Sequence, residues 1–244
     1  MTDPTIIFYF LLFAVAFLYA SVGHGGASGY LALMALFNMA PEVMKPTALI
    51  LNIFVSAIAF IQFYKARHFL WKLFLPLAAI SVPMAFVGGL ITIEQDLYKK
   101  ILGVMLLFAI VRFVGLRDSG TQENKKPSIP LALFLGGIIG LVSGMIGIGG
   151  GIILSPILIL LKWTNLKQAA AISALFIFVN SISGFAGQVY KGLQLNNNMM
   201  VFVIIALAGG IAGAYFGARK FNQLVLKRVL AAVLLIAVVK LFTI

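Results

Sequence analysis

The chain has 244 residues, of which 62% are hydrophobic and 10% are charged, and its formal net charge is +12. An ordinary soluble domain carries about 25% charged residues, so this composition indicates a chain solvated by lipid. The lack of cysteine excludes disulfides and thiolate metal sites, and the positive charge indicates loop residues that orient the protein in a membrane rather than a surface for nucleic acid.

Ten apolar runs follow one another, and we expect each to be helical because a backbone in hydrocarbon must satisfy its own hydrogen bonds. They cover residues 5–22, 27–40, 46–64, 73–93, 97–116, 129–147, 151–161, 168–190, 199–218 and 224–244. Six of them approach the roughly 20 residues that cross about 30 Å of hydrocarbon. The other four form two pairs, each divided by a glycine-rich motif. The first run lacks the basic start of a signal peptide, so we expect it to be retained.

The second half of the chain repeats the first. The motif GHGG at residues 23–26 matches GIGG at residues 147–150, and further matches follow at a nearly constant offset. Thr47-Ala48-Leu49 corresponds to Ser173-Ala174-Leu175, and Tyr64-Lys65 corresponds to Tyr190-Lys191. We therefore predict a first transmembrane repeat at residues 1–116, a polar linker at 117–128 and a second transmembrane repeat at 129–244, together one transport domain.

The orientation of the repeats depends on the broken pairs. If each pair crosses the membrane as one long helix, or as a complete hairpin, the repeats are parallel; with one long helix the 18 Lys and Arg divide nine against nine. If each pair is a re-entrant hairpin the repeats are inverted, with thirteen of these residues on one side and Lys45, Lys99, Lys100, Lys191 and Lys240 on the other. The positive-inside rule favours the second arrangement.

The predicted fold class is accordingly an all-α polytopic membrane protein with two homologous, inverted repeats. Each repeat consists of a Gly-broken re-entrant helical hairpin plus three transmembrane helices. We expect the protein in the cytoplasmic (inner) membrane of the cell as a multi-pass protein, with both termini outside. The basic linker and most Lys and Arg loops are then cytoplasmic.

The duplicated glycine motifs predict a substrate site. A glycine-broken hydrophobic segment at matching places in two repeats is typical of the binding site of a secondary transporter. Glycine lets one helical arm stop and another begin, and the N-terminus of the second arm attracts anions. Close helix packing is the alternative for the glycines. The membrane segments hold no carboxylate for a cation and no Lys or Arg in mid-segment. An anion would be held by backbone N–H groups, hydroxyls and amides.

The predicted substrate-binding residues belong to the two motifs and to the polar positions that follow them. They are His24, Gly25, Gly26, Ser28, Thr47, Asn52, Gly149, Gly150, Gly151, Ser173 and Asn180. A Ser or Thr can instead bond its own helix, and Asn52, Asn180 and Gln188 either line the path or join helices. His24 is also a candidate for proton coupling, or a neutral side chain bonded to a carbonyl; its counterpart is Ile148. We expect no cofactor and no metal.

The paired motifs GHGGASG and GIGGG, the Thr47-Ala48-Leu49 and Ser173-Ala174-Leu175 matches and the short basic loops resemble the sulfite exporter TauE/SafE family. The resemblance covers essentially the whole chain. The first motif carries His24 and Ala27 where a more glycine-rich version is common in the family. The resemblance implies transport of sulfite, an organosulfonate or a related small anion across the cytoplasmic membrane.

The predicted function is a secondary transporter of a small anion, sulfite or an organosulfonate, held by half-helix N-termini at the two breaks. A passive channel or facilitator for a small anion or neutral solute is the alternative. An intramembrane enzyme would need a nucleophile, a base or metal ligands together, which two distant histidines do not supply. The expected partners are the anion, membrane lipid, protons as a coupling ion and, in a homo-oligomer, further copies of the chain.

Overall fold

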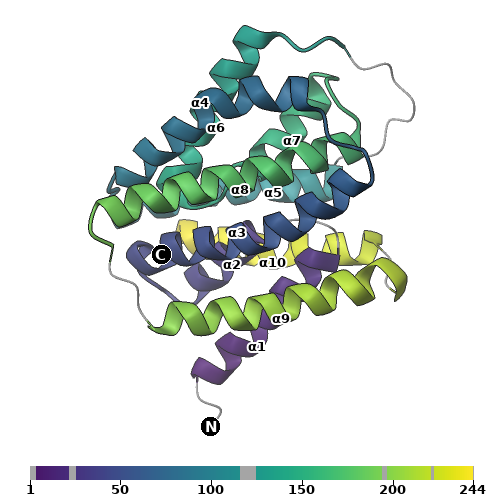
Figure 1. The fold of residues 1–244 in the computed structure, drawn as a ribbon. Helices are drawn as coiled ribbons and strands as arrows, with labels where there is room; N and C mark the ends of the chain where they lie inside the picture. The colour runs from purple at the N-terminus through teal and green to yellow at the C-terminus, as the bar shows by residue number, and fades with distance from the viewer. Residues whose placement is uncertain (1–3, 22–25, 116–124, 194–196, 221–222, 244) are drawn as a thin grey trace.

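The computed structural model describes residues 4–21, 26–115, 125–193, 197–220 and 223–243. Ten α-helices and no strand are found within these residues (Figure 1). Their bounds are α1 Pro4–Ser21, α2 Ala27–Leu36, α3 Pro41–Lys65, α4 Trp71–Leu90, α5 Gln95–Gly115, α6 Ile129–Ile146, α7 Gly151–Leu160, α8 Leu166–Tyr190, α9 Asn197–Lys220 and α10 Gln223–Thr243.

The helices follow the ten apolar runs, and the clearest difference is the start of α3. Pro41 occupies the first turn, where its missing N–H removes no helical hydrogen bond, so α3 begins five residues before the apolar run. Lys45 consequently lies inside the helix rather than in the preceding loop. The start of α8 is set by a capping box, in which Asn165 and Gln168 exchange side-chain to backbone hydrogen bonds.

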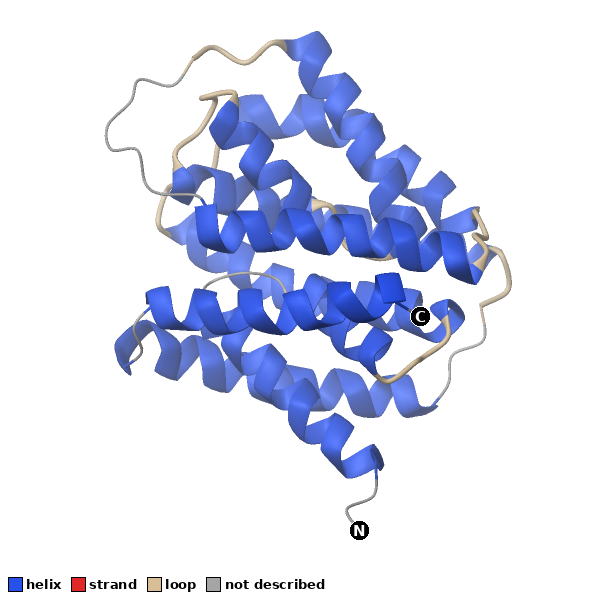
Figure 2. Cartoon of the chain, turned by 180° about the vertical axis from the view of Figure 1, so that it is seen from behind, coloured by secondary structure: helices blue, strands red, loops and turns tan. Residues whose placement is uncertain are grey.

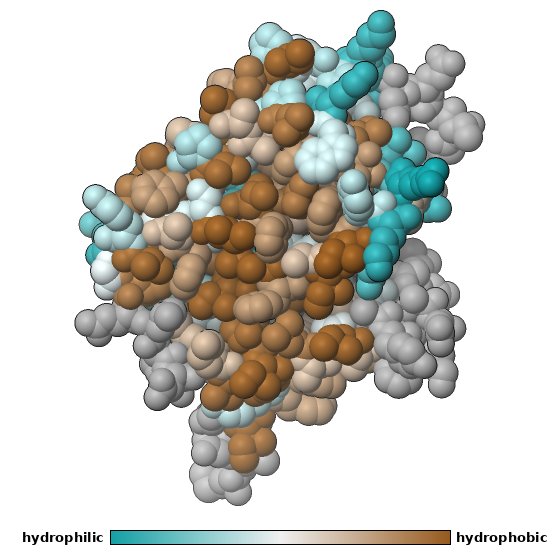
Figure 3. Space-filling view, in the orientation of Figure 1, coloured by the Kyte–Doolittle hydropathy of each residue, from teal (hydrophilic) through white to brown (hydrophobic). Residues whose placement is uncertain are grey.

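The exterior of the molecule is apolar enough for a lipid environment. In the described part of the chain, α3, α4, α6 and α8 are long and apolar enough to cross a membrane. Hydrophobic side chains cover a broad part of the face seen in Figure 3. In the described part of the molecule as a whole, Leu160, Ile204 and Phe134 are among the most exposed hydrophobic residues. Such an extended apolar surface marks a membrane protein rather than a soluble one.

The helices form two groups, and each group combines both halves of the sequence. One hydrophobic core lies among α4, α6, α7 and α8, and the other lies mainly among α1, α2, α5, α9 and α10. Figures 1 and 2 show these groups one above the other, with α3 and α8 side by side where the groups meet. Helix α4 of the first half therefore packs in the second half's core, and α9 of the second half packs against α1.

Glycines permit close backbone contact in two helix pairs, α4–α6 and α1–α9. An ideal Cβ on Gly136, Gly140 or Gly144 of α6 would lie only 2.0–2.3 Å from a backbone carbonyl oxygen of α4. On α9, a Cβ on Gly209 or Gly213 would lie 2.5 or 2.1 Å from a carbonyl oxygen of α1. Because these contacts advance in the same direction along both partners, α4 runs parallel to α6, and α1 runs parallel to α9. Glycines spaced by four residues permit this close approach.

Helices α3 and α8 run antiparallel. Lys45 near the start of α3 lines the same pocket as Gln188 near the end of α8. One turn further along α3, the Cδ1 atom of Leu49 would lie 3.6 Å from a Cβ on Gly184. Asn52 and Ser181 then lie close to the same glycine, Gly149. We call the contact between these two antiparallel helices the α3–α8 seam.

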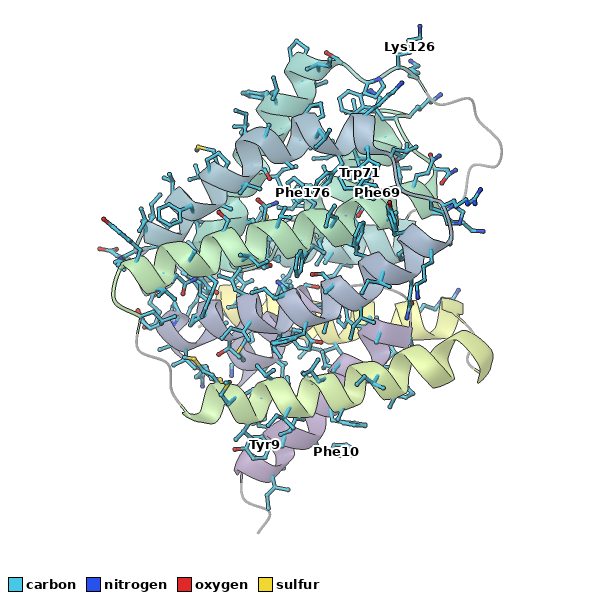
Figure 4. The ribbon with its side chains drawn as sticks, in the orientation of Figure 1. Tyr9, Phe10, Phe69, Trp71, Lys126 and Phe176 are labelled. Carbon is cyan, nitrogen blue, oxygen red and sulfur yellow. The ribbon has the colours of Figure 1, made fainter. Side chains whose placement is uncertain are left out.

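Aromatic and basic side chains gather where α3 turns into α4. The rings of Phe69 and Trp71 meet edge-on with centroids 4.8 Å apart (Figure 4), and Tyr64 packs on both. Trp71 is 49% exposed. The backbone N–H of Lys125 bonds the carbonyl of Lys162, which joins the end of the linker to the α7–α8 connection at this same end of the molecule. Tyr and Trp with nearby basic residues are typical of a membrane interface.

Candidate functional site

The second glycine motif separates two helices in the interior. Helix α6 ends at Ile146. The next residue, Gly147, is its C-cap and has a left-handed backbone with a φ of +87°. Gly149 and Gly150 also have positive φ, of +78° and +76°, and α7 begins directly after them. Other L-residues rarely adopt this backbone. We call residues 147–150 the second break. Gly147 to Gly151 are all buried.

Helix α7 is short and enclosed. Its 10 residues span about 15 Å, which is half the thickness of a bilayer core. Most of its side chains are buried, and it packs mainly against α8. Irregular backbone is tolerated at membrane depth only where protein or a water-filled cavity surrounds it. The second break meets this condition because its residues are buried within the protein.

Side chains from the first half cover the carbonyl groups at the end of α6. The Tyr98 hydroxyl of α5 donates to the Ile146 carbonyl at 2.9 Å, and Nδ2 of Asn52 donates to the Gly147 carbonyl at 3.4 Å. The negative end of the α6 dipole is thereby partly neutralised. Helix α7 begins directly after Gly150, and the N-terminus of a helix carries the positive end of its dipole, so the α7 side of the break is electropositive.

Buried polar atoms without a hydrogen-bond partner gather beside this break. Oδ1 of Asn52 and Oγ of Ser181 have no partner, and a Cβ on Gly149 would lie 3.0 Å from Nδ2 of Asn52 and 3.3 Å from Oγ of Ser181. The hydroxyl of Ser143, one turn before the break, is likewise unpaired. Such atoms are rare in proteins because burial without a partner costs about 1–3 kcal/mol each. Their grouping indicates a place where water or a ligand completes the hydrogen bonding.

The first glycine motif, residues 23–26, which we call the first break, is described only at Gly26. His24 and Gly25, both predicted site residues, lie outside the described residues. Gly26 precedes α2, and its Cβ would lie 2.6 Å from the Tyr30 hydroxyl. That hydroxyl is fully buried and has no hydrogen-bond partner. Like α7, α2 has 10 residues, most of them buried.

Several predicted site residues bond to protein groups. Ser28 shares a 2.6 Å hydrogen bond with the Tyr19 hydroxyl, and Thr47 donates to the carbonyl of Val43 on its own helix at 2.6 Å. Both contacts hold these side chains in the structure, with Ser28 tying α2 back to α1. Neither residue reaches the second break through a recorded contact.

The predicted residues on α8 divide in the same way. Ser173 shares a 2.7 Å hydrogen bond with Ser155 of α7, and its carbonyl would lie 3.1 Å from a Cβ on Gly151. Oδ1 of Asn180 accepts from Ser81 of α4 at 2.8 Å, and its Nδ2 donates to the Phe176 carbonyl at 2.8 Å. The structure thus brings Asn52, Gly149, Gly150 and Gly151 to one place, while Asn180 joins α8 to α4.

A pocket of about 360 Å³ opens beside the break. It lies where α3 and α5 begin and where α4 and α8 end, and we call it the Lys45 pocket. Glu42, Thr92 and Lys191 line its exposed rim, and Lys45, Tyr98 and Gln188 line its buried floor. The backbone of Lys45 adjoins the break, because its carbonyl oxygen would lie 2.8 Å from a Cβ on Gly147.

Sequence reasoning missed the cationic part of this region. Lys45 looked like a loop residue because the apolar run starts after it, and Tyr98 and Lys191 sit at helix ends among other polar residues. A usable signal was Pro41 with Glu42 in the next position, which is typical of a helix start and would have placed Lys45 in the helix. Tyr30, which reaches the first break, gave no signal beyond an ordinary aromatic residue in an apolar run.

Comparison with known proteins gives one consistent class. The model of the family described as sulfite exporter TauE/SafE matches residues 8–241. A probable membrane transporter protein of Sinorhizobium fredii is 35% identical over 233 residues, covering 94% of each chain. Probable membrane transporter proteins of Haemophilus influenzae and Bacillus subtilis are 26% and 24% identical, covering 83% and 90% of this chain and 82% and 91% of their own. No solved structure matches.

The apolar exterior, the long helices and these relatives define a polytopic membrane transporter. Within that class, the chain belongs to the sulfite exporter TauE/SafE family.

Proposed function

We propose that this protein carries a small anion across the cytoplasmic membrane as a secondary transporter, and that the anion is sulfite or an organosulfonate. The observation that carries the proposal is the second break, where a half-length helix begins beside unpaired buried side chains. The α7 N-terminus supplies positive potential, and Tyr98 and Asn52 cover the competing carbonyl groups of α6. Tyr30 beside Gly26 would play the corresponding part at the first break.

The unpaired atoms also suit this class of ligand. The hydroxyls of Ser143 and Ser181 can donate hydrogen bonds to oxyanion oxygens. Oδ1 of Asn52 is an acceptor, so it needs a hydrogen-bond donor on the ligand. An oxyanion that carries one donor, such as hydrogensulfite or an aminosulfonate, satisfies all three. An oxyanion with a bound water does the same.

We infer that the chain contains two inverted repeats. If α1–α5 are matched in order with α6–α10, the α4–α6 contact corresponds to α9–α1, and α7–α8 corresponds to α2–α3. The third helices of the two halves, α3 and α8, run antiparallel, as inverted repeats require. In this arrangement the two groups of helices rock against each other about the α3–α8 seam, and the site is exposed to one side at a time.

The same geometry supports an orientation in the cytoplasmic membrane. Helix α3 ends where α4, α6 and α8 begin, and the described basic residues at this end include Lys65, Arg67, Lys72, Lys125, Lys126, Lys162 and Lys167. We assign this end to the cytoplasm because cytoplasmic loops carry an excess of Lys and Arg. The Lys45 pocket then faces the outside.

Uptake into proteoliposomes tests the function with sulfite, thiosulfate, sulfate, sulfoacetate and taurine. We expect sulfite or a sulfonate to be transported, and Ser181→Ala to raise its half-saturating concentration about tenfold, as the loss of a hydrogen bond to a charged group implies. Ser183→Ala is the matched control, because Ser183 bonds the Val82 carbonyl instead.

Two results bear directly on the alternatives. Accumulation against a gradient would separate a coupled transporter from a passive channel. Failure of every anion in the panel, with protein that remains folded, would contradict the proposal.

A further inference from the structure

Gln188 is the most unusual group in the Lys45 pocket. Its side chain is 7% exposed, and its Nε2 atom is buried without a hydrogen-bond partner. A buried amide nitrogen has two hydrogens to donate, and leaving both unused is unfavourable. Since Gln188 lines the pocket, an acceptor placed there would satisfy it.

Lys45 brings a cation to the same floor. It is 9% exposed, and its ammonium group lies 3.2 Å from the Ile91 carbonyl and 3.4 Å from those of Gly88 and Gly89. These carbonyls form the C-terminal end of α4, where the helix dipole favours a positive charge. The contacts are longer than the 2.7–2.9 Å typical of charge-assisted hydrogen bonds. They hold the ammonium in place without fully engaging it.

The charges around the pocket favour an anion. The lining residues include two lysines, Lys45 and Lys191, and one carboxylate, Glu42. Tyr98 has already given its hydroxyl hydrogen to the Ile146 carbonyl, so it offers the pocket only an acceptor. The donors that remain are therefore Gln188 and the Lys191 ammonium group, while Lys45, which already donates to three carbonyls, adds its positive charge.

The pocket connects with the second break along the α3–α8 seam. Lys45, Leu49 and Asn52 lie on one face of α3, and Gln188, Gly184 and Ser181 lie on one face of α8, because residues three and four apart share a helix face. The outer and inner members of each set are seven positions apart, which corresponds to about 10.5 Å along the helix axis. The layer of Leu49 and Gly184 separates the two polar levels.

We propose that the Lys45 pocket is an outer oxyanion-binding site, in which Gln188, Lys45 and Lys191 hold a sulfite or sulfonate group before it passes to the second break. The inference rests on the proposed function and adds a second binding site to the transport path. The pocket discriminates by charge and by the presence of acceptor oxygens, while the break supplies the central site.

Cysteine labelling tests the pocket without relying on transport. The chain has no native cysteine, so Thr92→Cys places a single thiol at the exposed rim. Each reagent's rate is divided by its rate with a small thiol in solution, and on this scale we expect negatively charged sulfonatoethyl methanethiosulfonate to react faster than the positively charged trimethylammonioethyl reagent. Lys191→Gln should reduce this preference about tenfold, because one unit charge near 6 Å in water changes the rate of each reagent about threefold and in opposite directions. Lys100→Gln, an exposed lysine outside the pocket, is the matched control.

A competing anion provides the second measurement. Methanesulfonate is used because sulfite consumes thiol reagents, and the protein is kept in detergent without anionic lipid so that lipid phosphate does not occupy the pocket. We expect methanesulfonate to slow the labelling of Thr92→Cys. Equal rates for the two reagents after this normalisation, or labelling that methanesulfonate does not slow, would contradict the proposed anion site.

Transport kinetics place the pocket on the path. Gln188→Leu should raise the half-saturating concentration of sulfite about tenfold, whereas Gln62→Leu, the exposed counterpart in the first half, should leave it unchanged. An unchanged value in Gln188→Leu would remove the pocket from the path. If no anion is transported but methanesulfonate still protects Thr92→Cys, the pocket stands and the proposed function fails.

Discussion

The side-chain amide of Asn52 donates to the carbonyl of Gly147, 3.4 Å away, and so joins the middle of α3 to the end of α6. The donor comes from the first half of the sequence and the acceptor from the second, 95 residues later. The other end of the amide, Oδ1, is buried without a partner. One side chain thus supports the break and offers it a further polar atom.

Asn52 and Asn180 should respond differently to replacement by leucine. Asn52→Leu removes an unpaired acceptor and a long hydrogen bond, so we expect little change in melting temperature but a strong loss of anion transport. Asn180→Leu removes two 2.8 Å hydrogen bonds and leaves Ser81 without its acceptor. It should cost about 1–3 kcal/mol, which lowers the melting temperature by about 2–4 °C per kcal/mol. Thermal unfolding in detergent and uptake assays measure both effects. The reverse ranking in unfolding would contradict the assignment of Asn52 to the site.

Gly149→Ala should abolish most transport. The residue has φ +78°, and a Cβ would lie 2.7 Å from Cγ2 of Ile177 and 3.0 Å from Nδ2 of Asn52. The left-handed backbone alone costs a non-glycine residue about 1–3 kcal/mol, and the added carbon displaces the groups beside the break. Gly210→Ala is the control, because a Cβ there meets nothing within 4 Å. Transport is measured on variants with equal amounts of folded protein, and wild-type uptake by Gly149→Ala would be the contrary result.

Alanine should destabilise the α4–α6 contact much more at Gly140 than at Gly137. A Cβ on Gly140 would lie 2.3 Å from the backbone oxygen of Ser81, which cannot move without shifting α4. A Cβ on Gly137 would meet only the Ile80 side chain, at 3.0 Å. We expect Gly140→Ala to destabilise by roughly 1–3 kcal/mol, as overpacking does, and Gly137→Ala to have a much smaller effect. Equal melting temperatures for the two variants would contradict this close packing.

Single cysteines can test the orientation of the two halves. Glu42 lies in the first turn of α3 and Lys167 in the first turn of α8, and both side chains are exposed. Because α3 and α8 run antiparallel, we expect Glu42→Cys to be labelled by an impermeant reagent from outside the cell. Lys167→Cys should react only after the membrane is opened. Labelling of both from the same face would reject the inverted arrangement.

Leu49 should restrict flux between the Lys45 pocket and the second break. Its side chain is fully buried against Gly184, between the two polar levels of the seam. Leu49→Ala leaves a void there, so we expect faster downhill movement of sulfite in liposomes and weaker accumulation against a gradient. Leu51→Ala is the control, since Leu51 is equally buried but belongs to the core with α1 and α2. An unchanged leak in Leu49→Ala would show that the passage lies elsewhere.

The sequence predicted the all-helical membrane class, the ten helical segments and the two glycine interruptions, because hydrophobic run length and glycine placement are local properties. It also named Asn52 and Gly149 as candidate site residues, which the structure places beside each other. Their proximity could not be predicted, since it depends on how α3 packs against the break between α6 and α7. The role of Asn180 between α8 and α4 was equally hidden: Asn52 and Asn180 are both lone amides in apolar helices, and only their neighbours distinguish them.

The amino-acid sequence by itself determined that lipid is the solvent and that two helices are interrupted, because burial of apolar surface and the backbone freedom of glycine need no distant partner. The tertiary structure decided that α4 packs against α6 and α8 of the second half, and that α9 packs against α1 of the first half. It also decided that Lys45 and Gln188 line one pocket. These outcomes depend on which small residues let two backbones meet and on which buried polar groups find partners, and both are properties of packed pairs of helices.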